Sequence, residues 1–153
     1  MSTRVRWIFM GFAALLLIGG AILLCWLHVD GEDLALPEGE ITGYVTRLDI
    51  GLDTDSGTAT HDTNSFDITQ EQIIDLLQLL RESSYWRTRH GSSVSFDGDL
   101  VYTVSLSYRE NGKTQLLMIS VLDNELLHCD PAFGYLRITD PDFLEKFRSI
   151  LEN

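Results

Sequence analysis

An alternation of carboxylates at residues 53–57, Asp53-Thr54-Asp55-Ser56-Gly57, is the first stretch of this sequence that could do chemistry. Alternating carboxylates of this kind open calcium-binding loops, because they converge on one hard cation. The match ends at the later positions, where Gly57 occupies position five and Asn64 replaces the bidentate Glu of position twelve. The pattern therefore favours a solvated hairpin turn over a calcium site.

Imidazole and thiol groups offer the next possibilities. The four histidines lack the i, i+4 spacing of a helical zinc pair: His28, His61, His90 and His128. Cys129 stands beside His128 and Asp130, but neighbouring side chains of a strand point to opposite faces, which argues against a zinc cluster. As a nucleophile Cys129 would need a histidine base, and one cysteine with scattered histidines arises easily by chance.

Hydrolase chemistry has equally little support. Asp97-Gly98-Asp99 contains the two carboxylates that glycoside hydrolysis needs, but a small domain without long cleft-forming loops makes a turn the better interpretation. No G-x-S-x-G motif of a serine hydrolase occurs. We therefore predict no catalytic residues, no metal site and no cofactor, and we interpret the protein as a non-enzyme.

A small basic group in an otherwise acidic chain is the candidate binding surface: Trp86, Arg87 and Arg89. It could contact an anionic partner, or its arginines could pair with neighbouring carboxylates. Six aromatic residues could line a ligand pocket, although such side chains more often fill the core: Tyr85, Trp86, Tyr102, Tyr108, Phe133 and Tyr135.

The element that positions the rest of the chain is an uncharged apolar run from Trp7 to Leu27. As a helix it is about 31 Å long, which matches the hydrocarbon core of a bilayer. Arg4 and Arg6 precede it, so residues 1–6 are expected in the cytoplasm and the C-terminal domain outside. Trp7 and Trp26 stand at the two membrane interfaces. The run exceeds the core of a cleaved signal and lacks a small-residue cut site, which favours a retained single-pass anchor in the cell membrane.

Composition limits the possibilities for the part of the chain beyond the anchor. The formal net charge of −12 disfavours nucleic acid as a partner. Residues 28–40, rich in acidic residues, Gly and Pro, predict a linker, and residues 41–153 suffice for one modest domain. Cys25 and Cys129 fall on different sides of the predicted interface, so no disulfide within the chain is expected.

Periodicity predicts the elements of that domain. Alternation over residues 41–52, with the even positions Tyr44 to Leu52 buried, indicates a strand that pairs with residues 58–66. Thr69 and Gln72 form a capping box before a helix over residues 70–82. Residues 100–108 alternate as a strand with one wet face, and Asn111-Gly112 turns the chain back through residues 115–122.

Shorter strands are expected over residues 125–129 and 135–138, and Asp140-Pro141 begins a terminal helix. The apolar face of that helix comprises Phe143, Phe147, Ile150 and Leu151. The order predicts an α+β fold, in which a transmembrane helix precedes a ββαβββα domain with an antiparallel sheet and two helices packed on it.

This architecture resembles the small membrane-anchored extracytoplasmic domains of unknown function of Gram-positive bacteria. The shared features are the strand pair over residues 41–66, the capped helix after Asp67-Ile68-Thr69, the hairpin over residues 100–122 and the Asp140-Pro141 helix. The resemblance is architectural and implies no functional residue. The leading hypothesis is a module that binds a protein or an envelope component; a small-ligand sensor or carrier with an aromatic pocket, and a hydrolase, are the alternatives.

Overall fold

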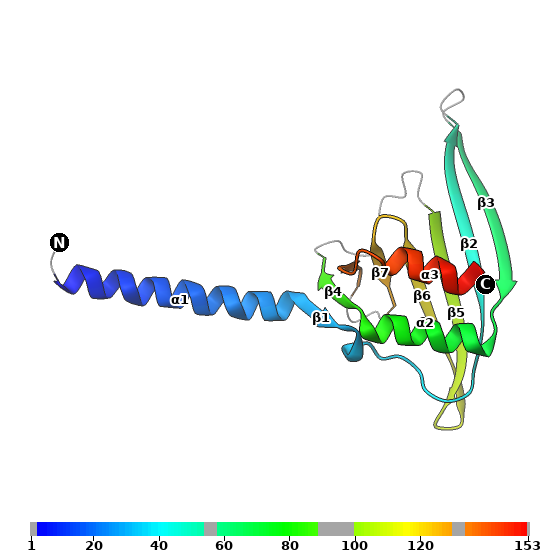
Figure 1. Cartoon of the computed structure of the whole chain (residues 1–153), viewed down its shortest axis with the longest axis horizontal. Helices are drawn as coiled ribbons and strands as arrows, with labels where there is room; N and C mark the ends of the chain where they lie inside the picture. The colour runs from blue at the N-terminus through cyan, green and yellow to red at the C-terminus, as the bar shows by residue number, and fades with distance from the viewer. Residues whose placement is uncertain (1–2, 54–57, 89–99, 130–133, 153) are drawn as a thin grey trace.

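A computed structural model describes residues 3–53, 58–88, 100–129 and 134–152. Within these ranges the chain forms a helix, α1 (Thr3–Leu27), and an eight-stranded antiparallel sheet with two further helices, α2 (Gln70–Glu82) and α3 (Phe143–Glu152) (Figure 1). The strand order in the sheet is β1-β4-β8-β7-β6-β5-β2-β3. The α+β fold class expected from the sequence is confirmed.

The eight strands are β1 (His28–Asp30), β2 (Ile41–Asp53), β3 (Thr58–Asp67), β4 (Ser84–Arg87), β5 (Leu100–Glu110), β6 (Lys113–Leu122), β7 (Leu126–His128) and β8 (Leu136–Ile138). Two of them, β1 and β4, were not expected from the sequence. Both are too short to show a periodic pattern of their own; β1 pairs with β4, and β4 pairs in turn with β8.

The helix α1 projects away from the sheet, and its direction is roughly perpendicular to the strands (Figure 1). Its segment Met10–Leu27 is long and apolar enough to cross a membrane, and none of this segment is buried against the rest of the chain. A helix of this kind at an N-terminus serves either as a membrane anchor or as a signal sequence.

The junction between α1 and the sheet differs from the expected linker over residues 28–40. The strand β1 begins at His28, directly after the last residue of α1, and Val29 and Leu34 are buried in the core. A short 3-10 helix, η1 (Gly31–Asp33), follows β1 and lies against the C-terminal end of α2, where the Gly31 N–H donates to the Ser83 carbonyl at 2.9 Å. This segment is structured because its apolar side chains complete the core.

The helix α2 forms as its sequence predicts. The Thr69 hydroxyl accepts from the Gln72 N–H at 3.2 Å, and the Gln72 side chain accepts from the Thr69 N–H at 2.9 Å. This reciprocal capping box satisfies two of the otherwise unpaired amides of the first turn. The predicted apolar face is buried: Ile73, Leu76, Leu77 and Leu80.

The helix α3 begins at Phe143, two residues later than Pro141. Asp140 still organises its start, because one carboxylate oxygen accepts from the Asp142 N–H at 3.0 Å and the other contacts the Lys146 ammonium at 3.0 Å. Phe147 is fully buried, and its ring lies edge-on to Tyr102 with the centroids 5.5 Å apart. Aromatic packing of this kind holds α3 on the sheet.

Both α2 and α3 cover the same face of the sheet (Figure 1). On β2 this face carries Ile41 and Val45, whereas Tyr44, at 48% exposure, faces away. The expectation that the even positions of β2 are buried was therefore wrong. The pairing of β2 with β5 determines which face of β2 is buried, because Val45 stands opposite the buried Val104 of β5. Both faces of β2 carry apolar residues, so alternation alone could not distinguish them.

The face of the sheet opposite the helices is mixed in character. A polar row crosses four strands through Ser65, Thr46, Thr103 and Ser120, with side-chain hydrogen bonds in its first and last pairs. Beside it lies a small buried cluster comprising Val101, Leu122 and Leu126. The expectation of a wet second face on the strand over residues 100–108 was thus wrong, because Val101 and Ser105 are buried and Thr103 and Ser107 are partly buried. Leu48 and Tyr135 pack on the cluster that contains Val101.

The hairpin between β5 and β6 turns where Asn111 and Gly112 predicted. Their φ angles are 51° and 76°, the left-handed conformations that tight hairpin turns need. The two strands then pair without interruption from Glu110–Lys113 to Val101–Leu122. This regular pairing fixes the register of β5 and β6, the two strands whose buried side chains contribute to the core.

Candidate functional site

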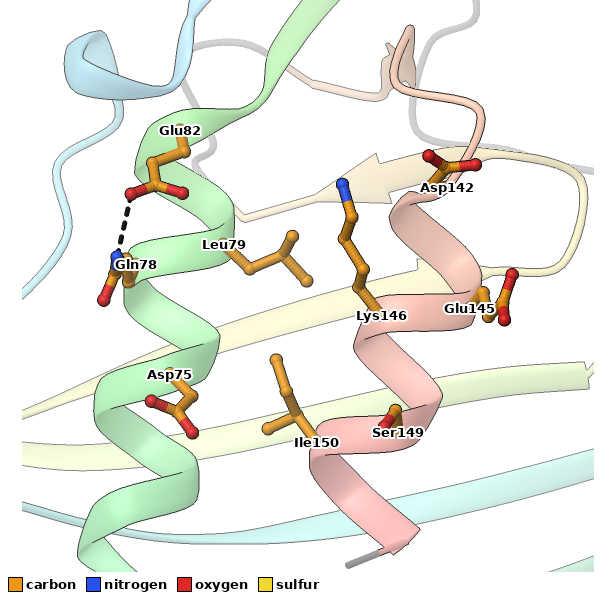
Figure 2. A pocket seen from close by; sticks show the side chains of 9 residues that line it. All are labelled: Asp75, Gln78, Leu79, Glu82, Asp142, Glu145, Lys146, Ser149 and Ile150. Carbon is orange, nitrogen blue, oxygen red and sulfur yellow. Dashed lines mark hydrogen bonds between the residues drawn. The ribbon is translucent and has the colours of Figure 1, made fainter.

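A groove runs along the outer surface of the helical layer, between the antiparallel helices α2 and α3 (Figure 2). Its volume is about 710 Å³. Leu79 and Ile150 point toward each other across it and form its apolar part (Figure 2). The lining comprises Asp75, Gln78, Leu79, Glu82, Asp142, Glu145, Lys146, Ser149 and Ile150.

The two helices are held at a fixed separation by core packing below the groove and by a polar contact at one end. The Gln72 side-chain amide donates to the Ile150 carbonyl at 2.8 Å, which joins the first turn of α2 to the last turn of α3. This bond also satisfies a carbonyl that has no partner within its own helix. On α2 the lining residues Asp75, Gln78, Leu79 and Glu82 recur at helical spacing, so they form one stripe beside the buried face.

The groove is acidic. Four carboxylates line it, from Asp75 and Glu82 on α2 and from Asp142 and Glu145 at the α3 side, against the single ammonium of Lys146 among the described lining residues. Lys146 is itself paired with Asp140, so the positive charge of Lys146 is largely offset by Asp140 and the four lining carboxylates leave the groove negatively charged. A groove with this charge and an apolar floor suits a cationic, amphipathic segment.

The pair formed by Asp140 and Lys146 shifts the titration of both groups. The pKa of the Asp140 carboxyl lies below its ordinary value, first because the Asp142 N–H donates to the carboxylate and then because of the Lys146 ammonium. The pKa of Lys146 is raised, mainly by its hydrogen bond to Asp140. Lys146 is exposed and Asp140 is partly exposed, so solvent screens the pair and each effect on stability is small.

Replacing Asp140 by asparagine tests this arrangement through pH. A carboxyl whose pKa is depressed by folding stabilises the folded state above its unfolded pKa, near 3.8, and this contribution is lost as the pH falls through the folded pKa. We expect the melting temperature of Asp140→Asn to lie a few degrees or less below the wild type at pH 6. The two melting temperatures should converge toward pH 3. A difference that stays constant over this range would contradict the assignment.

The predicted binding residues lie at the junction between α1 and the sheet. Trp86 is on β4, and its ring meets the His28 ring edge-on at a centroid distance of 5.7 Å. The Arg87 guanidinium lies 5.4 Å from the centre of the Trp26 ring, which is a cation–π distance. The structure thus brings Trp26, predicted at the membrane interface, together with the basic group, while Arg89 lies outside the described residues. The remaining residues predicted near the membrane interface all belong to α1: Arg4, Arg6 and Trp7.

Two of the aromatic residues considered for a ligand pocket are in the core. Tyr85 is fully buried and its hydroxyl donates to the Leu80 carbonyl at 2.9 Å, while Tyr102 is 4% exposed and packs on Phe147. Burial raises the pKa of the Tyr85 phenol well above its ordinary value, although a hydrogen bond with Ser83 opposes the shift. Tyr85 therefore stays a neutral donor, and the two rings support the core interpretation. Phe133 lies outside the described residues.

The residues considered for catalysis or metal binding do not converge in the described part of the chain. Cys129 is buried, and His128 packs against Tyr135 with the ring centroids 5.0 Å apart. Within the described ranges no group of three or more His, Cys, Asp or Glu side chains is placed to hold a metal ion. Asp55, His90, Asp97 and Asp99 fall outside those ranges, so the interpretations that involve them remain predictions.

No known protein family, curated protein or solved structure matches this chain. The resemblance to membrane-anchored extracytoplasmic domains therefore stays a prediction, and the case for a function rests on the geometry of the chain itself.

Sequence reasoning missed the acidic groove. A polar stripe, Asp75, Gln78 and Glu82, is visible beside the apolar face of α2. A second one comprises Asp142, directly before α3, and Glu145 and Ser149 on α3. Nothing in either stripe shows that the two helices lie side by side. The two helices lie side by side because both pack on the same face of the sheet.

Proposed function

We propose that the chain is a single-pass membrane protein whose acidic domain binds a basic segment of a partner protein in the groove between α2 and α3. In this proposal α1 is a retained anchor, the N-terminus is cytoplasmic and the domain is extracytoplasmic. The apolar Met10–Leu27 segment and the preceding Arg4 and Arg6 support this orientation. The protein acts by binding and needs no cofactor.

The observation that carries the proposal is the combination of charge and shape in the groove. Four carboxylates flank the apolar side chains of Leu79 and Ile150, with Glu82 accepting from the Gln78 side-chain amide at 2.8 Å (Figure 2). Lys146, the one cation among the described lining residues, is held by Asp140. A basic amphipathic helix would place its apolar residues on Leu79 and Ile150 and its Lys or Arg residues against the flanking carboxylates. The same negative charge disfavours nucleic acid.

A small-ligand sensor with an aromatic pocket gains no support from the structure, since the rings of Tyr85 and Tyr102 fill the core between helices and sheet. The junction formed by Trp26, Trp86 and Arg87 fits a different part of the proposal. An arginine stacked on a tryptophan at the end of a membrane span is suited to the headgroup level of the bilayer.

The groove is tested with the full-length protein in nanodiscs of a neutral phospholipid. The probe is a fluorescent helical peptide of about 14 residues that combines Ala with Lys at helical spacing. A peptide of this composition has little affinity for neutral lipid. We expect the double charge reversal Asp75→Lys with Glu82→Lys to weaken binding at least tenfold, measured by fluorescence anisotropy. Each substitution replaces a carboxylate of the groove lining with an ammonium group, which repels the Lys residues of the peptide.

The matched control reverses two carboxylates outside the groove, Glu40→Lys with Glu110→Lys, and so changes the net charge equally. Both residues are exposed. We expect this control to lower affinity by no more than about twofold, the residual effect of a long-range field. Equal losses in the two double variants would show that the peptide senses overall charge, and would overturn the groove as the site.

A further inference from the structure

The strand β3 forms an open edge of the sheet, and it lies at the opposite end of the sheet from α1 (Figure 1). Its pairing with β2 is continuous from Asp67 to Thr58, without a bulge. Natural edge strands are usually protected by proline, lysine, a bulge or a covering element. β3 contains neither proline nor lysine, and residues 60–65 are all exposed.

The direction of its free backbone groups follows from one hydrogen bond. The Ile68 N–H donates to the Gly43 carbonyl on β2 at 3.3 Å. Successive residues of an antiparallel strand direct their N–H and C=O groups alternately toward and away from the partner. The outward-facing residues of β3 are therefore the odd-numbered ones, from Asp67 through Ser65, Thr63 and His61 to Ala59. Among the described residues no second strand pairs with them, so they present a ladder of a length that suits one added strand.

The charges beside this ladder indicate what kind of strand would fit. Asp49 and Asp62 stand directly opposite each other on β2 and β3, a like-charged pairing that is unfavourable in a sheet. Asp49 is 3.9 Å from the Arg47 guanidinium, whereas Asp62 has no ion-pair partner in the part of the chain that the structure describes. The two carboxylates line a surface hollow of about 190 Å³ with Arg47 and Asn64. A cation supplied from outside the edge would relieve the repulsion.

We propose that the edge of β3 accepts an extended, basic segment of another protein as an additional strand. Backbone hydrogen bonds to the outward-facing residues would supply affinity, and a Lys or Arg beside Asp62 would supply selectivity. This site is separate from the groove between α2 and α3, and it recognises extended backbone instead of a helix.

The placement of α1 excludes a second copy in the same membrane as the occupant, a step that rests on the anchoring proposed above. Pairing β3 with the β3 of another copy would continue one sheet, and the two α1 helices would leave that sheet in opposite directions. Seven strand spacings separate β1 from β3, so the edge stands roughly 30 Å from the membrane end of the sheet. The edge is thus presented to a partner away from the bilayer surface.

The test again uses the full-length protein in neutral nanodiscs. The probe is a fluorescent peptide of about eight residues that alternates Thr and Lys, a β-compatible sequence with all its lysines on one face. Its control is the same peptide with every backbone amide methylated, which removes the N–H donors of both strand edges and keeps the charge. We expect methylation to weaken binding at least tenfold. Equal binding of the two peptides to the unmodified protein would overturn the proposal.

Two variants locate the site on the protein. Thr63→Pro removes an outward-facing N–H and leaves the ladder to β2 intact, so it should abolish binding with little change in melting temperature. Asp62→Asn should weaken binding several-fold. The groove reversal Asp75→Lys with Glu82→Lys should leave the methylation effect unchanged, which separates this proposal from the preceding one. Full binding by a folded Thr63→Pro protein would also overturn it.

Discussion

Replacing Gly31 by alanine is expected to destabilise the domain by about 3 kcal/mol or more, because an added methyl group has no room. A Cβ at this position would clash with the carbonyl oxygens of Leu80 and Arg81 and would lie 2.7 Å from the Arg81 carbonyl carbon. These are backbone atoms at the end of α2, and they cannot rotate away. The change therefore must separate η1 from α2 or distort both.

The measurement is urea unfolding of the full-length protein in detergent micelles, followed by tryptophan fluorescence. Gly39→Ala is the matched control, since nothing lies within 4 Å of the Cβ it would add. Its φ of 93° makes alanine strained there, at roughly 1 kcal/mol. If Gly31→Ala unfolds at the same urea concentration as this control, the close approach of η1 to α2 is wrong.

Truncating Phe147 to alanine is the second large expected effect, with a loss of about 3–5 kcal/mol in the free energy of unfolding. Its ring is fully buried, meets Tyr102 edge-on and stacks on Phe143 with centroids 6.0 Å apart. Removing it leaves a cavity between α3 and the sheet. Because α3 forms one wall of the groove, the basic helical peptide should also lose affinity.

Glu145→Ala provides the comparison for Phe147→Ala. Glu145 lies on the same helix and lines the groove, but its side chain is exposed, so its removal should change stability by no more than about 0.5 kcal/mol. The same urea titration compares the two variants. A similar loss in both would mean that α3 contributes little to the core, contrary to the packing of Phe147 on Tyr102.

Local sequence patterns predicted the structure correctly where the interactions of an element lie within that element. The capping box of Thr69 and Gln72, the Asn111-Gly112 turn and the apolar faces of α2 and α3 depend on neighbours within a few residues, and the structure has all of them. Patterns failed where pairing partners decided the outcome. The buried face of β2 depends on which side of β5 it meets, and β1 is a strand only because β4 lies beside it.

The candidate sites show the same division. Trp86 and Arg87 stood out by composition, but no pattern in the sequence places Arg87 on Trp26, which lies far earlier in the chain. The acidic groove and the open edge of β3 were missed because both are relations between elements. The carboxylates of Asp49 and Asp62 stand opposite each other only in the register of the β2–β3 pair.

By itself the sequence determined an apolar N-terminal helix long enough to cross a membrane, an acidic α+β domain, and the helices and turns whose hydrogen bonds are local. Only the tertiary structure decided that α1 continues directly into the sheet, that α2 and α3 share one face and that β3 is left as the open edge. The physical reason is range. Helix caps and turns are satisfied within a few residues, whereas sheet order and groove formation depend on burial between segments far apart in the chain.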